Sequence, residues 1–118
     1  METKVIATSK APAAIGPYVQ GIEAGNIVFF SGQLGIDPAV GKLVEGCVKC
    51  QAKQALKNIG ALLEEVGATT AHVVKTTCFL AEMADFAAFN AVYAEYFSEN
   101  KPARACFGGN DIPKGALV

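Results

Sequence analysis

The side chain best suited to chemistry in this chain is Arg104, which lies in the segment Lys101-Pro102-Ala103-Arg104-Ala105-Cys106. Pro102 fixes its own φ and pushes Lys101 toward an extended conformation, so a preceding helix must end there and a strand can begin at once. A guanidinium near the start of a strand is a rigid, permanently charged fork that matches a carboxylate in shape. We therefore interpret Arg104 as the binding group for a small carboxylate. The alternative is a surface arginine paired with one of the eleven acidic residues.

Two thiols at C-x-x-C spacing, Cys47 and Cys50, are a second candidate site. Such a pair can work in redox chemistry or provide half of a zinc site. The chain has no second C-x-x-C and a single histidine, His72, so zinc lacks ligands. A thioredoxin-like pair follows a strand, whereas this one falls where a helix is expected to begin. We expect buried or half-buried helix residues, no metal, and reduced thiols at Cys47, Cys50, Cys78 and Cys106.

Three other places hold residues that could complete a binding site. The loop 11–17 contains two prolines and a glycine, cannot continue a strand or helix, and so presents Tyr18 at a fixed place. Ser31 and Gly32 interrupt an apolar run, and a glycine there lets a ligand approach the backbone; the alternative is an ordinary strand end. Asn90 falls near an apolar helix face, where a buried amide needs partners. We expect it to pin that helix to a loop or strand.

The first part of the chain reads as strands followed by a loop. Strands are expected at residues 3–7, 18–23 and 27–33, and the last two form a hairpin with its turn at 24–26. The strand 27–33 is apolar on both faces, which predicts helices on one side and a neighbouring chain on the other. Residues 34–46 are predicted to be an exposed loop with turn chemistry at Asp37-Pro38.

The second part alternates helices and strands. Apolar residues at helical spacing predict a helix from about Cys47 to Val66, stopped by Gly67. The β-branched segment 73–80 is predicted to be a central strand, with His72 as a surface or half-buried residue at its entrance. A second helix with an aromatic face should begin at a capping Asp85 and end before Pro102.

The final residues suggest an unfinished sheet. A strand is expected around Arg104, and residues 112–118 look like the start of a last strand. Because a terminal strand of that length is short, we expect a tail beyond Val118 that completes the sheet.

Composition limits the possible partners and the location of the protein. A chain of 118 residues forms one domain, residues 1–118. Apolar residues make up 52% and charged residues 18%, which predicts apolar surface buried between subunits. A net charge of −1 without a Lys or Arg run makes nucleic acid and membrane partners unlikely candidates. No signal-peptide core or membrane-length apolar run is present, so we expect a cytoplasmic protein.

The order of these elements predicts an α+β fold with both helices on one face of a mixed sheet. The opposite face of the sheet must also be covered. Self-association into a closed ring is the natural cover, and clefts between the subunits are the natural ligand sites.

Several segments together resemble the RidA (YjgF-type) family of reactive-intermediate deaminases. They are residues 11–18, Phe30-Ser31-Gly32-Gln33, Val74-Lys75-Thr76-Thr77, Phe89-Asn90 and residues 102–106. The resemblance covers nearly the whole chain. It implies a chorismate-mutase-like fold and a homotrimer with a central barrel and interfacial sites. It also implies hydrolysis of 2-imino acids, such as 2-iminobutanoate and 2-iminopropanoate, to 2-keto acids and ammonia without metal or organic cofactor.

The resemblance also implies roles for individual residues. Arg104 would bind the substrate carboxylate through two hydrogen bonds, and Tyr18 of a neighbouring chain would help close the pocket. Gly32 with Ser31 would let backbone groups reach the ligand. The main chain at Cys106 would meet the imine end and help orient the attacking water, with no role required of the thiol.

Asn90 would support the site structurally. Two features of this chain depart from the family pattern. The family's last strand supplies a glutamate that polarises the water, and that position is expected just beyond Val118. In addition, Phe107-Gly108-Gly109-Asn110 stands where the family more often continues the strand. The shape of the pocket, and with it the substrate range, is therefore expected to differ.

Two other function classes compete with the deaminase. Some relatives are described as endoribonucleases that inhibit translation, but this chain has one histidine and no basic stripe, and its aromatic residues map to helix cores. The other class is a trimeric binding or chaperone-like protein that holds small acids without turnover. Only an assay separates that class from the deaminase.

Overall fold

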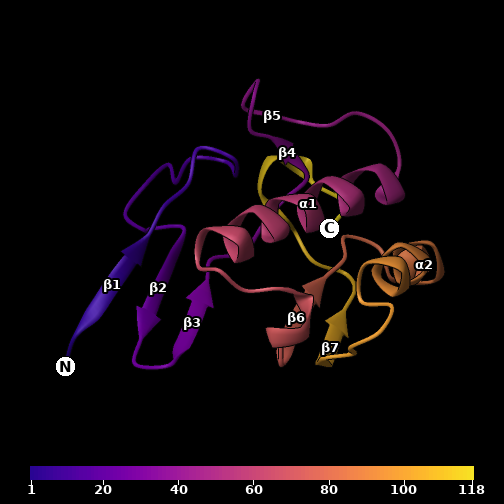
Figure 1. Ribbon diagram of the computed structural model, residues 1–118. Helices are drawn as coiled ribbons and strands as arrows, with labels where there is room; N and C mark the ends of the chain where they lie inside the picture. The colour runs from indigo at the N-terminus through magenta and orange to yellow at the C-terminus, as the bar shows by residue number, and fades with distance from the viewer.

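The computed structural model describes residues 1–118 as an α+β fold (Figure 1). Strands β1 (Thr3–Ile6), β2 (Gly21–Ala24) and β3 (Ile27–Phe30) form an antiparallel sheet at one end of the molecule. The predicted hairpin of β2 and β3 is confirmed, with Gly25 at φ +63° in its turn. Strand β2 begins at Gly21, and not at Tyr18 as predicted, because the residues before Gly21 belong to the loop.

The predicted loop 34–46 contains a small hairpin of its own. Its two strands, β4 (Ile36–Asp37) and β5 (Lys42–Leu43), are two residues each and pair antiparallel. Asp37 Oδ1 accepts a hydrogen bond from the Ala39 N–H at 2.9 Å, an Asx turn. The turn chemistry at Asp37-Pro38 is therefore confirmed, whereas the short strands were not predicted.

Helix α1 (Val48–Glu65) confirms the prediction for this segment. Its apolar residues face inward, and its lysines face solvent. The N–H of Gly67, at φ +71°, donates to the Glu64 carbonyl, and the N–H of Ala68 donates to the Leu63 carbonyl. This Schellman arrangement satisfies carbonyl groups that the end of a helix leaves free, which is why the helix stops at this glycine.

A parallel strand pair carries the Arg104 segment. Strand β6 (Lys75–Phe79) leads through helix α2 (Phe86–Tyr96) to β7 (Ala103–Phe107), which lies beside β6 in register. Phe79 is opposite Phe107, and Thr76 is opposite Arg104. The prediction of a central strand is wrong, because β6 pairs only with β7. The apolar pattern of β6 reflects how the faces of the strand pack. It does not reveal whether both edges of the strand pair with neighbouring strands.

His72 lies at the surface, as predicted, but the start of β6 and the capping of α2 differ from the predictions. His72 is exposed in the 3₁₀ turn η1 (Thr70–His72), where its Nδ1 accepts from the Thr69 N–H, so the strand begins only at Lys75. Asp85 precedes α2 within the turn η2 (Met83–Asp85), but its side chain makes no capping hydrogen bond. The prediction that the helix begins after Asp85 is confirmed, since Asp85 occupies the N-cap position, but the expected side-chain cap does not form.

The prediction of a strand at residues 112–118 is also wrong. The segment contains the 3₁₀ turn η3 (Pro113–Gly115), in which Lys114 and Gly115 have φ of +63° and +68°. Two successive residues with positive φ turn the chain and prevent a strand ladder. Leu117 then donates its N–H to Gln51 Oε1 at 2.7 Å and accepts from the Ala81 N–H at 3.0 Å. These bonds attach the last residues to α1 and to the segment after β6.

The core lies where the two helices meet the end of β6. Its buried members are Val48, Ala52, Leu56, Leu80, Phe89, Val92, Tyr93 and Phe97. Cys78 and Cys106 pack against this cluster from the strands. The side chains that alternate with them on β6 and β7 therefore point away from the helices. Neither helix has the length and apolar character that crossing a membrane requires.

Large apolar side chains on the strands remain exposed in the single chain. Phe79 and Phe107 stack with ring centroids 5.9 Å apart and are 49% and 52% exposed. Val5, Ile22 and Phe29 form a row across β1, β2 and β3, in which Phe29 is 62% exposed. Ile22 itself is half-buried, and we call the other four, Val5, Phe29, Phe79 and Phe107, the exposed strand residues. Exposed aromatic groups of this kind mark surfaces that associate with another molecule.

Candidate functional site

Arg104 is held in place by three residues of one helix face. Its Nη1 donates a hydrogen bond to Asn90 Oδ1 on α2 at 2.7 Å. Its guanidinium carbon lies 4.6 Å from the ring centroid of Tyr93 and 5.5 Å from that of Phe86. Phe86, Asn90 and Tyr93 are spaced i, i+4 and i+7, so they share the face of α2 that is turned toward β7. Asn90 therefore links helix to strand, and the aromatic rings stabilise the cation.

No carboxylate neutralises Arg104. It is the only arginine of the chain, and the only ion pair in the structure joins Lys10 to Glu64 on the surface. The alternative of an arginine paired with an acidic side chain is therefore wrong. Only one of its N–H groups is bonded within the chain, to Asn90, and its other donors are free. A half-buried cation with spare donors is a ready binding group for an anion.

Neutral polar groups lie beside this cation. The hydroxyls of Thr76 and Tyr93 are 2.6 Å apart, and the Cys78 thiol lies 4.0 Å from the Thr76 hydroxyl. Burial raises the pKa of Tyr93, while the hydrogen bond to Thr76 acts in the opposite direction. The Tyr93 hydroxyl thus stays protonated at neutral pH and adds no negative charge that would compete with a ligand for Arg104.

The main chain of Cys106 faces an open edge. The Ala103 N–H donates to the Val74 carbonyl, and the Phe107 carbonyl accepts from the Leu80 N–H. Residues 103 and 107 thus direct their peptide groups toward β6, and by alternation Arg104 and Cys106 direct theirs to the other side. No strand pairs with β7 on that side. The N–H and carbonyl of Cys106 are therefore available to a ligand.

The thiol of Cys106 is poorly suited to act as a nucleophile. Burial raises the pKa of the Cys106 thiol, and the charge of Arg104 only partly offsets this. A thiol with a raised pKa is protonated at neutral pH, and the thiol form is a weak nucleophile. The strand thus offers backbone groups at this position and little thiol chemistry.

Tyr18, Ser31 and Gly32 lie on the other part of the molecule. Tyr18 is 52% exposed, and its hydroxyl accepts from the Ile15 N–H at 3.4 Å. The Ser31 hydroxyl donates to the Val19 carbonyl at 2.6 Å. Gly32 is exposed, and a side chain there would meet nothing within 4 Å. No hydrogen bond connects any of them with Arg104.

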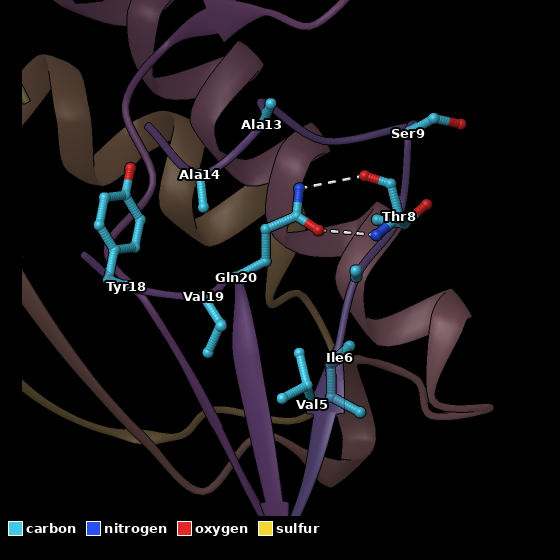
Figure 2. Close-up of a pocket in the computed structure, with 10 residues that line it drawn as sticks. Val5, Ile6, Thr8, Ser9, Ala13, Ala14, Tyr18, Val19 and Gln20 are labelled. Atoms are coloured by element: carbon cyan, nitrogen blue, oxygen red, sulfur yellow. Dashed lines mark hydrogen bonds between the residues drawn. The ribbon is translucent and has the colours of Figure 1, made fainter. Parts of the chain in front are cut away.

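A shallow hollow of about 380 Å³ adjoins this loop (Figure 2). Tyr18 lies at one margin and Thr8 at the other, and the Gln20 amide exchanges two hydrogen bonds with the Thr8 backbone between them. Gln20 Nε2 also donates to the carbonyls of Ala11 and Pro12. The hollow is lined by no charged side chain, so it offers no grip for a carboxylate. Gln20 instead fixes the loop that presents Tyr18.

The predicted site residues therefore form two groups within one chain. The arginine group consists of Arg104, Asn90 and Cys106, which lie together on β7 and α2. The loop group consists of Tyr18, Ser31 and Gly32, which lie at the ends of β2 and β3. Contacts within the chain hold each group together, through Arg104 and Asn90 in one and through Ser31 and Val19 in the other, but no hydrogen bond joins the two groups.

Sequence reasoning assigned Phe86 and Tyr93 to the core and overlooked their contact with Arg104. The signal was present, because Asn90 stands between these two aromatic residues at helical spacing. Gln20 and Thr76 were also overlooked. Their roles depend on partners 12 and 17 residues away, at distances that no local pattern reveals.

Known proteins place the chain in a family. A family model described as endoribonuclease L-PSP matches residues 8–118. The mouse 2-iminobutanoate/2-iminopropanoate deaminase is 49% identical over 115 residues, which are 98% of this chain and 85% of the mouse protein. This chain belongs to the RidA family. A RutC family protein of Pyrococcus abyssi is 48% identical over 118 residues, 100% of this chain and 93% of that protein.

The RidA fold is equally clear from solved structures. The crystal structure of E. coli TdcF with bound serine superposes with a TM-score of 0.91 at 38% identity, covering 97% of this chain and 91% of TdcF. The structure of RidA from an Antarctic Psychrobacter gives 0.92 at 44% identity, covering 97% and 92%. These matches confirm the α+β fold of the RidA family that the sequence motifs implied.

Proposed function

We propose that this protein hydrolyses 2-imino acids, such as 2-iminobutanoate and 2-iminopropanoate, to 2-keto acids and ammonia. The observation that carries the proposal is Arg104, a positioned cation without an acidic partner. The deaminase name of the mouse relative gives the reaction, and the serine bound to TdcF shows that a structural relative accepts a small amino acid.

Arg104 binds the substrate carboxylate through its free N–H groups. Asn90 and the two flanking rings hold the guanidinium before the substrate arrives, so little side-chain freedom is lost on binding. The open edge of β7 presents the Cys106 N–H and carbonyl to the reacting end. The substrate is thereby held at its acid group and at its imine carbon by rigid elements of the fold.

The chemistry makes modest demands on the protein. A protonated imine is electrophilic, and water adds to its carbon to give a carbinolamine. A proton then moves from oxygen to nitrogen, the carbon–nitrogen bond breaks, and the products are a 2-keto acid and ammonium. Imines hydrolyse unaided, so holding the substrate and water in line supplies most of the catalysis.

The loop group of a neighbouring chain completes the site in this proposal. Tyr18 and Gly32 are exposed, Ser31 is half-buried, and none of the three is hydrogen-bonded to Arg104 of its own chain. The exposed strand residues give the single chain an apolar surface suited to association. A homotrimer with a central barrel covers these strands and joins each arginine group to a loop group.

The direct test is turnover of an imine produced in place by a threonine dehydratase. We expect Arg104→Ala to lose roughly a hundredfold in kcat/KM, because charge-assisted hydrogen bonds to the substrate are removed. Arg104→Lys should lose most activity as well, since an ammonium cannot form the two-pronged contact. Lys57→Ala, at an exposed position of α1, is the matched control. Unchanged turnover in both Arg104 variants would remove Arg104 from the mechanism.

Chemical modification gives a second test that is independent of turnover. Phenylglyoxal reacts with arginine, and this chain has only one. One residue per chain should be modified, and 2-oxobutanoate should slow the reaction by occupying the guanidinium. Equal rates of modification with and without the keto acid would show that the acid group binds elsewhere.

The endoribonuclease description of the family model calls for a control on RNA. Against ribonuclease activity, the single histidine is exposed and bonded to its own turn, without a partner for acid–base chemistry. Cleavage of single-stranded RNA that survives a final sizing column and disappears in a site variant would favour that activity. We expect no such cleavage.

A further inference from the structure

The first turn of α1 brings two exposed thiols into contact. Cys47 occupies the N-cap position, and Cys50 stands three residues later. Their Sγ atoms are 3.7 Å apart, and both residues are exposed. The expectation of buried or half-buried thiols is wrong, because this turn projects into solvent. Side-chain rotation must shorten the gap by somewhat less than about 2 Å to reach the length of a disulfide bond.

The surroundings favour chemistry at Cys47. The backbone N–H of Cys50 lowers the pKa of the Cys47 thiol, and the Cys50 thiol and the Lys49 N–H act in the same direction. These are the free N–H groups of a helix start, which stabilise a thiolate. Gly46, at φ +116°, also has a close neighbour, since a Cβ there would lie 3.0 Å from the Cys50 sulfur. A glycine at this position leaves room for the second thiol.

We propose that Cys47 and Cys50 form a redox-active dithiol, in which Cys47 is the attacking thiol and Cys50 resolves the mixed disulfide. The co-reactant is a small-molecule disulfide of the glutathione type. Contact, exposure and the placement at the helix start carry this inference. The dithiol is separate from the arginine group and from the deaminase proposal.

The reaction balances in two exchange steps. The Cys47 thiolate attacks one sulfur of the disulfide, forms a mixed disulfide and releases one glutathione, which takes up a proton. Cys50 loses its proton to solvent, attacks the Cys47 sulfur and releases the second glutathione. The pair is oxidised by two electrons to an internal disulfide, and the glutathione disulfide is reduced to two thiols.

The other two cysteines provide an internal comparison. Cys78 and Cys106 stand opposite each other on β6 and β7 and are half-buried. Burial raises the pKa of both thiols, so both are mainly protonated at neutral pH. Oxidation that depends only on the presence of two neighbouring cysteines should affect both pairs. Oxidation that depends on exposure and a helix start should affect Cys47 and Cys50 alone.

The test is oxidation of the whole protein with glutathione disulfide, followed by alkylation and tryptic mapping. Trypsin separates all four cysteines, because Lys49 lies between the first two and Arg104 between the last two. The digest without reduction should contain peptides 43–49 and 50–53 joined by a disulfide. Alkylation of Cys47 and Cys50 should fall at least about tenfold, with Cys78 and Cys106 unchanged.

Two variants separate the roles of the thiols. Cys50→Ala should accumulate one glutathione on Cys47, because the resolving thiol is missing. Cys47→Ala should react roughly tenfold more slowly, since the favoured thiolate is missing. Both positions are exposed, so the variants should keep the unfolding temperature of the parent protein. A digest without the joined peptides, a disulfide only between separate chains, or faster oxidation of Cys78 and Cys106 would overturn the proposal.

Discussion

The polar side chains at the two ends of the molecule have different kinds of hydrogen-bond partner. In the β6–α2–β7 end, side chains bond one another across elements, as Arg104 does with Asn90 and Thr76 with Tyr93. In the β1–β3 end, Ser31 and Tyr18 bond only the nearby main chain, and Gly32 has no close neighbour. One end holds a preorganised cation, and the other holds exposed Tyr18 and Gly32 beside half-buried Ser31. The contrast supports the proposal that a complete site is shared between two chains.

The largest effect is expected when association between chains is prevented, which tests whether one chain alone holds a complete site. Phe107→Asp places a charge among the exposed strand residues, and we expect single chains that lose at least about a hundredfold in imine turnover while Arg104 is intact. Sedimentation velocity and the coupled dehydratase assay measure the two effects. Val40→Asp is the control, because Val40 is 66% exposed on the β4–β5 hairpin. Full activity in a single chain would show that one chain holds a complete site.

A smaller effect is expected from the residue that holds the cation. Asn90→Ala removes a charge-assisted hydrogen bond worth about 2 kcal/mol, which corresponds to a loss of roughly thirtyfold in kcat/KM. Asn90→Asp keeps a hydrogen-bond partner for Arg104 but neutralises the charge of the guanidinium. The variant should raise KM, because the new carboxylate competes with the substrate for Arg104. An Asn90→Asp protein with normal KM would contradict the role of Arg104 as the free cation.

Mixing variants tests directly whether the two groups come from different chains. Tyr18→Ala alone should lose about tenfold, since one ring that closes the pocket is missing. Reassembling equal amounts of Tyr18→Ala and Arg104→Ala chains should restore about a quarter of parental activity. The reason is that about a quarter of the subunit interfaces then combine an intact Tyr18 with an intact Arg104. A mixture that shows only the average of the two variants would place both groups in the same chain.

The least effect is expected at the Cys106 side chain. Burial raises the pKa of this thiol, so it stays protonated through neutral pH and no loss or gain of activity should follow its titration there. Cys106→Ser keeps the main chain and should change kcat/KM by less than about threefold. A loss of about a hundredfold would assign chemistry to the sulfur, which the comparison of the two ends does not require.

Local patterns identified most of the elements. The spacing of apolar residues defined α1, Gly67 defined its end, and the turn residues defined the β2–β3 hairpin, because each depends on interactions within a few residues. The same reasoning gave a wrong last strand and a wrong position for β6 in its sheet. Strand pairing depends on distant segments, and positive φ at Lys114 leaves no clear mark in the sequence.

The candidate site divides in the same way. The sequence was sufficient to select Arg104, Asn90 and the family motifs, since residue type and order carry that information. It missed the ring contacts of Arg104, the role of Gln20 and the exposure of Cys47 and Cys50. The hydrogen bonds and ring contacts of Arg104 and Gln20 form only when β7 lies against α2 and the Gln20 amide reaches the backbone of residues 8–12.

The sequence by itself determined the family, the two helices and the presence of one candidate cation. Only the tertiary structure decided that this cation has no acidic partner, that its strand edge is open and that the loop group lies apart from it. The physical reason is that charge pairing and edge pairing are set by distances between segments remote in the chain, whereas helical periodicity and turn chemistry are set by neighbours along it.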